Sequence, residues 1–375
     1  MSEDANPYLN SFFIPDQLGE SILSMQPAFD DSGIAHPVTN NPRMESWQRL
    51  LAEAVKDPEE LLRMLSLPER WLEDARKAAR IFPLRVPRGF IARMNPGDPE
   101  DPLLRQVMPL GLELSNAPGF SGDPLNEATA MVRPGVLHKY QNRVLLVTTG
   151  ACVVHCRYCF RRNFPYGEAN PAPGVWAEAR NYLATQPGVR EVILSGGDPL
   201  SLTDSRLMTL AGSLEAVPHL TRLRIHTRLP VVLPERITPA LLSILTQGRL
   251  RKVMVLHVNH PAEVDQAVRE ALGRLRKTGV TLLNQSVLLR GINDNAEVLE
   301  QLSEVLFDAG VIPYYLHQLD KVAGAAHFLV EDSHALELSA RLRARLPGYL
   351  VPRLVREVPG ASAKIPLELG MDGEC

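Results

Sequence analysis

Six short apolar runs, separated by longer amphipathic stretches, follow one another from about Arg143 onward in this 375-residue chain. They are "VLLVTT", "EVILSG", "RLRIHT", "KVMVLHV", "TLLNQSVLL" and "IPYYLHQL". Alternation of this kind predicts parallel strands joined by helices. Six runs are fewer than the eight of a closed (β/α)8 barrel, so an open, partial barrel and a doubly wound sheet are the candidate folds. Both folds place their chemistry at the carboxyl ends of the strands.

The composition excludes several classes of function. With a formal net charge of -3, the chain has no overall basic field for nucleic acid or anionic lipid. No apolar run approaches the roughly 20 residues of a membrane span, and the first residues lack the pattern of a secretion signal. We therefore expect a cytoplasmic protein that binds neither nucleic acid nor membrane. In that reducing compartment, clustered cysteines do not indicate a disulfide framework.

The chain before the first strand divides into two parts. Residues 1–42 mix Pro, Asn, Asp and Ser without apolar periodicity, which predicts a loosely ordered extension. Residues 43–135 are expected to form a helical region, because apolar residues recur there at helical spacing. A first helix is predicted to carry Trp47, Leu50, Leu51, Ala54 and Val55 on one face. A second should begin at Asp57 and Pro58 as cap and first-turn residue and carry Leu61, Leu62 and Leu65. The barrel core is placed at 136–330, and a C-terminal helix with a lysine-bearing segment at 331–375.

The stretch "CVVHCRYCFRR" holds three of the 4 cysteines of the chain: Cys152, Cys156 and Cys159. The spacing C-x3-C-x2-C supplies three thiolate ligands, whereas structural zinc sites and electron-transfer clusters usually take four. On a [4Fe-4S] cluster, the iron without a protein ligand can be chelated by a small molecule. A zinc site with His155 or another residue as fourth ligand is the alternative that the spacing leaves open. Cys375, the terminal residue, is interpreted as incidental.

Further polar residues lie at the expected strand ends. Gly196, Gly197 and Asp198 follow the second run, and glycines let a backbone approach a ligand closely. His257 and Gln285 place polar groups at later strand ends, where a structural role is the alternative.

One lysine near the C-terminus has an unusual setting. Lys364 stands among small residues in "EVPGASAKIPLEL". An accessible amine there suits Schiff-base chemistry with pyridoxal 5'-phosphate (PLP), although an ordinary surface lysine would have the same surroundings.

The cysteine loop, with Tyr158 directly before Cys159, resembles the signature of the radical S-adenosylmethionine (SAM) superfamily. The longer stretches "HKYQNRVLLVTTGACVVHCRYCFRR", "LSGGDPL", "RLPVVLPERIT", "HVNHPAEV", "LLNQSVLLRGINDN", "YYLHQLDKVAGAAHF" and "VPGASAKIPLEL" resemble the lysine 2,3-aminomutase family. Four others, "FPLRVPRGFIARM", "DPLLRQV", "APGFSGDPL" and "FRRNFPY", are similar to the branch that supplies β-lysine for modifying elongation factor P. The resemblance covers roughly residues 43–369. It implies an α/β fold, a partial (β/α)6 radical-SAM barrel of TIM type behind an N-terminal helical layer, with a C-terminal PLP-lysine segment.

The resemblance also implies three cofactors: a [4Fe-4S] cluster, SAM and PLP. The three cysteines would hold the cluster. SAM would contact Gly196, Gly197, Asp198, His257 and Gln285. Lys364 would be the catalytic lysine that carries PLP, and Arg143, nine positions before Cys152, would bind the PLP phosphate.

For the substrate, the resemblance implies L-lysine and its conversion to (R)-β-lysine by a 1,2-shift of the amino group. Arg161 would hold the α-carboxylate, and a planar guanidinium suits this task. Asp320 and Glu357 would hold the ε-ammonium; well-known members of the family have Asp at the second position. The implied partners are an electron donor protein, elongation factor P and its lysyl-transferring enzyme.

Three alternatives remain open from the sequence. The first is a non-catalytic zinc or iron-sulfur module. The second is a radical SAM enzyme that acts on another amino acid. The third is a radical SAM enzyme without PLP that activates a partner protein.

Overall fold

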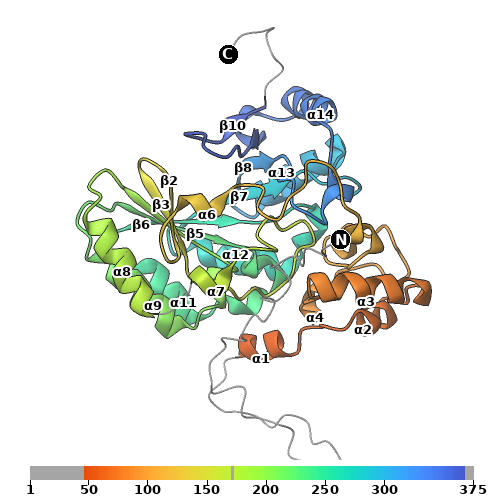
Figure 1. Cartoon of the computed structure of the whole chain (residues 1–375), viewed down its shortest axis with the longest axis horizontal. Coiled ribbons are helices and arrows are strands. Elements are labelled where there is room, and N and C mark those ends of the chain that lie inside the picture. The colour runs from red at the N-terminus through yellow and green to blue at the C-terminus, as the bar shows by residue number, and fades with distance from the viewer. Residues whose placement is uncertain (1–45, 170–172, 368–375) are drawn as a thin grey trace, which may run out of the picture.

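A computed structural model describes residues 46–169 and 173–367 of the chain. The prediction of a loosely ordered extension at 1–42 lies outside these residues. Within them, one ten-stranded sheet forms the centre, with a layer of helices from the N-terminal part of the chain beside it and further helices along its outer face (Figure 1).

The strands follow one another across the sheet in chain order. They are β1 (Met131–Arg133), β2 (Val136–Tyr140), β3 (Arg143–Val147), β4 (Glu191–Ser195), β5 (Arg222–Thr227), β6 (Arg251–Leu256), β7 (Thr281–Val287), β8 (Ile312–His317), β9 (Arg353–Arg356) and β10 (Ile365–Pro366). All pairs from β3 to β9 are parallel, while β1–β2, β2–β3 and β9–β10 are antiparallel. The six predicted strands are confirmed as β3 to β8. The sequential order without a switch point confirms the partial barrel and excludes the doubly wound sheet.

The sequence analysis missed the outer strands, and β9 matters most among them. It pairs in parallel with β8, and β10 pairs back on it. These two strands, which lie in the C-terminal segment that begins at residue 331, therefore extend the same sheet. This pairing carries Lys364, which directly precedes β10, toward the end of β8.

Helices cover the outer face of the sheet. They are α8 (Pro173–Ala184), α9 (Asp204–Glu215), α11 (Pro239–Thr246), α12 (Gln266–Arg276), α13 (Ala296–Asp308) and α14 (Asp332–Arg345). Side-chain caps explain where several begin: Thr203 accepts from Arg206 N, and Asp265 from Val268 N. In Figure 1, α8, α9 and α11 lie along one side of the strands, and α14 lies beside the C-terminal strands.

The two faces of the sheet differ in polarity. In β5, Leu223 and Ile225 are buried in the same apolar cluster as the covering helices, while Arg224 and His226 alternate with them and are only partly buried. Because successive side chains point to opposite faces of a strand, the inner face is polar and incompletely filled. The interior of the partial barrel is thus built to receive ligands.

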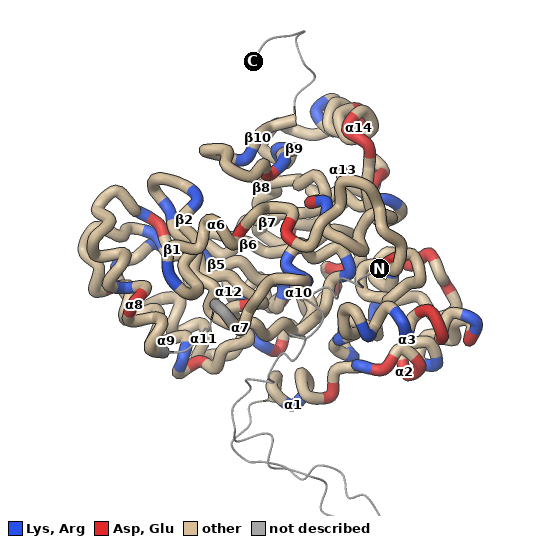
Figure 2. Tube along the Cα trace, in the orientation of Figure 1, with Lys and Arg blue, Asp and Glu red and all other residues tan. Residues whose placement is uncertain are grey.

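The N-terminal layer consists of short helices. They are α1 (Ser46–Ala52), α2 (Pro58–Met64), α3 (Leu72–Ile81), α4 (Arg88–Ile91), α5 (Pro102–Arg105) and α6 (Glu127–Ala130). The predicted start of α2 is confirmed, since the Asp57 side chain accepts from Glu59 N at 3.0 Å and Pro58 opens the helix. Figure 2 shows acidic and basic residues interleaved along α2 and α3.

The predicted first helix is only partly right. It ends at Ala52, so Ala54 and Val55 lie beyond it, and Leu50 is 36% exposed. The β-branched Val55 instead forms an antiparallel bridge with Val86. This tertiary pairing overrides the helical spacing.

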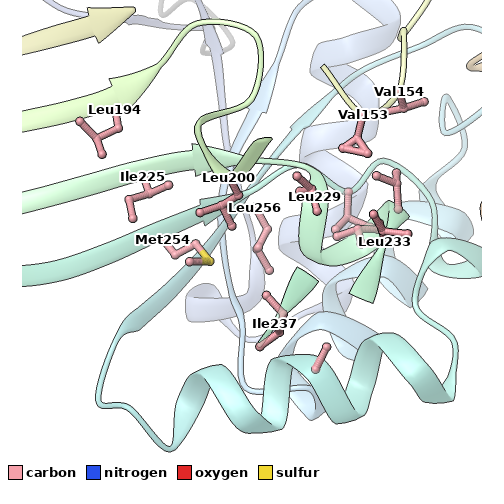
Figure 3. Packing of buried hydrophobic residues seen from close by; sticks show 14 of the residues in the cluster. Val153, Val154, Leu194, Leu200, Ile225, Leu229, Leu233, Ile237, Met254 and Leu256 are labelled. Carbon is pink, nitrogen blue, oxygen red and sulfur yellow. The ribbon is translucent and has the colours of Figure 1, made fainter. Parts of the chain in front are cut away.

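The N-terminal layer is fastened to the loop that follows β3. Arg157 of that loop is fully buried, donates to both oxygens of Glu113 at 2.8 and 2.6 Å, and also donates to the Phe82 carbonyl at 2.8 Å. Val153 and Val154 join the main apolar core together with Leu229 and Leu233 (Figure 3). The cysteine loop is therefore held rigidly between two layers.

In the part of the chain that the structure describes, no helix has the length and apolar character needed to cross a membrane.

Candidate active site

The three predicted cluster ligands lie on the loop after β3. Cys152, Cys156 and Cys159 are free thiols, and Cys159 N donates to the Cys156 carbonyl at 3.0 Å in a tight turn. Burial raises the pKa of Cys159 to about 11, with Cys156 adding to the shift, and raises that of Cys152 well above its usual range. Three thiolates that repel one another need a cation to stabilise them.

The zinc alternative can be compared with the side chains around the cysteine loop. Among residues 46–169 and 173–367, no three His, Cys, Asp or Glu side chains stand close enough to hold one ion. His155, the alternative fourth ligand, bonds through Nδ1 to the Pro83 carbonyl at 2.8 Å and stacks on Phe82. It is thus engaged by the N-terminal layer. A bond from Nδ1 to a carbonyl is also usual for a histidine that binds a metal through Nε2, so this contact does not exclude zinc. The three thiols on one loop fit a cluster with one open iron.

The glycine turn after β4 lies against the start of the cysteine loop. Gly197 N donates to the Thr149 carbonyl at 2.7 Å, and Asp198 N donates to the Ala151 carbonyl at 2.8 Å. Gly196 has φ +125°, and a β-carbon at either glycine would overlap these carbonyl oxygens. Only glycine permits this approach. The predicted SAM-contacting turn and the cluster loop therefore form one unit.

Asp198 has a structural task within that turn. Its buried carboxylate accepts from Leu200 N at 3.0 Å, from the Thr227 hydroxyl at 2.7 Å and from Arg228 N at 2.8 Å. The side chain thus links the turn after β4 to the chain after β5. Contact of Gly196, Gly197 and Asp198 with SAM stays a prediction.

The other two predicted SAM contacts come from later strands. His257 follows β6 and stacks on Tyr158, with its Nε2 2.9 Å from the Tyr158 hydroxyl. Burial lowers the pKa of His257 to about 3, so the ring is neutral. Gln285 stands half-buried in β7, and its side chain has no hydrogen bond to another described residue. Contact of either residue with SAM stays a prediction.

Arg161 is buried and firmly held. Its Nε and Nη2 donate to the two oxygens of Glu127 at 2.7 and 2.9 Å, and its Nη1 donates to the Ser195 hydroxyl at 2.8 Å. These bonds use three of the five N–H groups of a guanidinium. The remaining N–H groups are enough for one substrate carboxylate.

Lys364 and Glu357 lie together across the β9–β10 turn. The Lys364 ammonium donates to Glu357 Oε2, and Lys139 lies 3.2 Å from Oε1 of the same carboxylate. Lys139 is also 3.2 Å from Glu127. Although the site is partly desolvated, the cations Lys364 and Lys139 lower the pKa of Glu357 to about 2. A chain of alternating charges thus connects Lys364 with Arg161.

Asp320, which follows β8, belongs to the same cluster. Burial, together with the neighbouring Glu357, raises its pKa to about 7, while Lys364 and Lys139 oppose the shift. No described side chain hydrogen-bonds its carboxylate. A half-ionised acid without a partner, beside a second acid, is suited to receive an ammonium group.

Arg143 lies at the edge of this cluster. Its guanidinium stacks over Tyr140 at 3.9 Å, and the Tyr140 hydroxyl donates to Glu357 Oε1 at 3.4 Å. The two residues face each other where β2 pairs with β3. Lys139, Tyr140 and Glu357 also line a cavity of about 290 Å³. Tyr140 thus stands between Arg143 and the acid that pairs with Lys364, and a ligand shared by Arg143 and Lys364 stays a prediction.

The inner face of the barrel also holds polar atoms that lack partners. The Nε2 atoms of His226 in β5 and His317 in β8 are buried without a hydrogen bond to any described residue. Burial, together with the positive charge of Lys364, lowers the pKa of His317 to about 3. Buried polar atoms are normally satisfied. A water or a polar ligand in the barrel interior could pair with these two atoms.

The comparisons with known proteins agree with this site. Residues 146–302 match the radical SAM superfamily, so the fold and the cysteine loop define a radical SAM protein. The L-lysine 2,3-aminomutase of Escherichia coli (strain K12) is 53% identical over 90% of this chain and 98% of that one. Those of Haemophilus influenzae and Clostridium subterminale are 50% and 36% identical, over 85% and 86% of this chain and 95% and 77% of theirs.

The chain belongs to the L-lysine 2,3-aminomutase family and is an isomerase of the radical SAM class. Enzymes of this family use a [4Fe-4S] cluster, SAM and PLP. Membership decides against the non-catalytic zinc or iron-sulfur module. A solved radical SAM methyltransferase from Sphaerobacter thermophilus has a TM-score of 0.39 at 16% identity over 59% of this chain and 68% of that chain, a likeness that carries no argument.

The sequence analysis missed several residues of the site. Glu127, Lys139 and Arg228 received no role, although each lies in or beside a stretch that resembles the family. The sequence marks each of them only as a charged residue next to apolar or turn-forming residues. Such a pattern does not predict which residue the side chain contacts, because the partners lie up to 218 positions away along the chain.

Proposed function

We propose that this protein converts L-lysine to (R)-β-lysine in a PLP-dependent reaction. The observation that carries the proposal is the meeting of four side chains from distant segments: Arg161, Asp320, Glu357 and Lys364. Glu127 and Lys139 link the first of them to the last two through ion pairs. One basic amino acid, with a carboxylate at one end and an ammonium at the other, complements this set.

The charges of the site select the substrate. Arg161 presents unused N–H groups to the α-carboxylate, and Asp320 with Glu357 presents two carboxylates to the ε-ammonium. A neutral or acidic amino acid would leave both acids unpaired, at a cost of several kcal/mol. This disfavours the alternative of an enzyme that acts on another amino acid.

The cofactors supply the reactivity: PLP would activate the migrating amino group, while the cluster and SAM would generate a radical that removes hydrogen from the β-carbon. The chain supplies orientation. Cys152, Cys156 and Cys159 would hold the cluster, Gly196 and Gly197 would admit SAM close to the backbone, and Lys364 would tether PLP. Arg143 would hold the PLP phosphate. Fixing both ends of lysine keeps its β-carbon in place through the reaction.

The wider role stays a prediction from the resemblance. It comprises a cytoplasmic location, an electron donor protein, and supply of β-lysine for modification of elongation factor P. Support for the last point comes from the stretches similar to that branch of the family.

The test is anaerobic incubation of reconstituted protein with SAM, dithionite, PLP and L-lysine, followed by chiral amino-acid analysis. We expect (R)-β-lysine. Asp320→Ala should abolish turnover of lysine while the absorbance of the cluster is unchanged. Borohydride reduction in the presence of PLP should modify Lys364 in the wild type and leave Lys364→Ala unmodified. Failure to form β-lysine with iron and PLP both bound would contradict the proposal.

A further inference from the structure

Arg228 occupies a buried position directly after β5, in the stretch "RLPVVLPERIT" that the proposed mechanism leaves without a role. It precedes α10 (Leu229–Val232) and is only 6% exposed. Its backbone N–H donates to Asp198 at 2.8 Å, which fixes it to the glycine turn. A buried arginine needs a reason, because desolvating a guanidinium is costly.

The contacts of the Arg228 guanidinium divide into two sets. Nη2 donates to Glu263 Oε2 at 2.9 Å and to Gln106 Oε1 at 2.6 Å. Nη1 lies 2.7 Å from Cys156 Sγ and 2.8 Å from the Tyr158 hydroxyl. The side chain thus spans the distance between a buried carboxylate and a candidate cluster ligand.

Glu263 holds Arg228 in place. It is fully buried, and its Oε1 accepts from Asn259 N at 2.9 Å and from Gln106 Nε2 at 3.1 Å. Each partner of Arg228 is therefore itself fixed by the fold. A rotation of Arg228 away from Cys156 would break several buried hydrogen bonds at once.

The contact distinguishes Cys156 from the other two cysteines. Among the described residues, the sulfur of Cys156 accepts a hydrogen bond from a side chain, and the sulfurs of Cys152 and Cys159 do not. Hydrogen bonds to cluster sulfurs, and positive charge nearby, are among the factors that set the potential of an iron-sulfur cluster. Reduction adds one electron to the site, and a fixed cation stabilises the added negative charge.

We infer that Arg228 tunes the iron-sulfur site: it donates to the Cys156 thiolate and makes reduction of the cluster easier. This inference rests on the cluster assignment in the proposed function. It makes Arg228 a positioning residue, because it acts through Cys156 and touches no substrate. Reduction of the cluster takes one electron, which dithionite supplies, and transfers no proton.

The experiment is a potentiometric titration of the anaerobically reconstituted protein, followed by electron paramagnetic resonance of the reduced cluster. Arg228→Gln removes the cation, and Arg228→Lys keeps the charge but loses the planar fork. We expect the ratio of reduced to oxidised cluster at a fixed potential to fall about tenfold in Arg228→Gln, a shift of about 59 mV to more negative potential. Arg228→Lys should lie between Arg228→Gln and the wild type.

Two further variants keep the experiment decisive. Arg228→Gln leaves Glu263 charged and buried, so the double variant with Glu263→Gln carries the measurement if the single one fails to fold or to bind iron. Arg236→Gln is the matched control: Arg236 is fully buried in the same stretch and pairs with Asp204 at 2.7 Å. We expect it to lower stability without changing the potential.

The outcomes separate the two proposals. If the wild type binds iron and the Arg228 variants titrate at its potential, or shift no more than Arg236→Gln, the tuning role is wrong while the cluster assignment stands. If the wild type takes up no iron, the cluster assignment is wrong, and the role of Arg228 is overturned with it.

Discussion

Lys364 and Glu357 form an ion pair across the β9–β10 turn, so the predicted PLP lysine is held by a predicted substrate acid. The Lys364 ammonium thus lies where the ε-ammonium of lysine is expected to bind. Once Lys364 carries PLP, it no longer presents a free ammonium, and Glu357 becomes available. The proposed function therefore gives Glu357 two cationic partners in succession.

Glu357→Gln should change the two binding steps in opposite directions. Without the ion pair, Lys364 is freer to react, so we expect faster PLP incorporation, measured as borohydride-trapped PLP at Lys364. Loss of a charge-assisted hydrogen bond worth about 1.5–3 kcal/mol should raise the KM for L-lysine by about 10- to 100-fold. Glu357→Asp, which keeps the carboxylate on a shorter side chain, is the control and should keep most activity. A parallel loss of PLP incorporation and lysine affinity would contradict this account.

The pKa of Asp320 predicts a pH dependence of lysine binding. Burial, with a contribution from Glu357 and a smaller one from Glu127, raises the pKa of its carboxyl from 3.8 to about 7, while Lys364 and Lys139 oppose the shift. Between these values the folded protein holds a proton that the unfolded chain releases, so the contribution of Asp320 to stability decreases as pH rises from about 4 to 7.

Lysine requires the ionised form of Asp320. We therefore expect its affinity to rise about tenfold from pH 6 to pH 8, with release of a proton that calorimetry in buffers of different ionisation enthalpy detects. Asp320→Asn should bind weakly at every pH. A wild-type affinity that is flat over this range would show that Asp320 does not face the substrate.

Glu127 should affect binding of the α-carboxylate end of lysine, because it orients Arg161. It is buried and holds both Arg161 and Lys139, so Glu127→Gln leaves two cations short of a partner. We expect a lower Tm and at least a tenfold higher KM for lysine, because Arg161 is no longer oriented. Glu215→Gln is the control, since Glu215 stands at the end of α9, away from the site, and pairs with Lys252 and Arg249. It should lower Tm comparably and leave the KM unchanged.

The barrel core was predictable because its strands are apolar and lie between amphipathic helices, which gives a strong periodic signal. The outer strands were missed because β1, β9 and β10 have only three, four and two residues. The hairpin of β2 and β3 was missed because its first strand, "VLHKY", carries polar residues toward the site.

The candidate site was predicted as a set of separate residues. Cys152, Cys156 and Cys159 are close in sequence, so their proximity follows from their spacing. The Lys364–Glu357 pair depends on the β9–β10 turn, and the contact of Arg228 with Cys156 joins positions 72 apart. Such contacts follow from strand order and burial, which no local pattern encodes.

Gly197→Ala tests whether the glycine turn and the cluster loop are one unit. A β-carbon at this position would overlap the carbonyl oxygen of Ala151, the residue before Cys152, and the oxygen belongs to the backbone and cannot rotate away. We expect the loop to shift and the iron content of reconstituted protein to fall to less than half of the wild-type value. Gly212→Ala is the control, since nothing lies within 4 Å of its β-carbon in α9, and it should raise stability by about 0.5–1 kcal/mol. If Gly197→Ala kept the full iron content and an unchanged Tm, the glycine turn and the cluster loop would not form one unit.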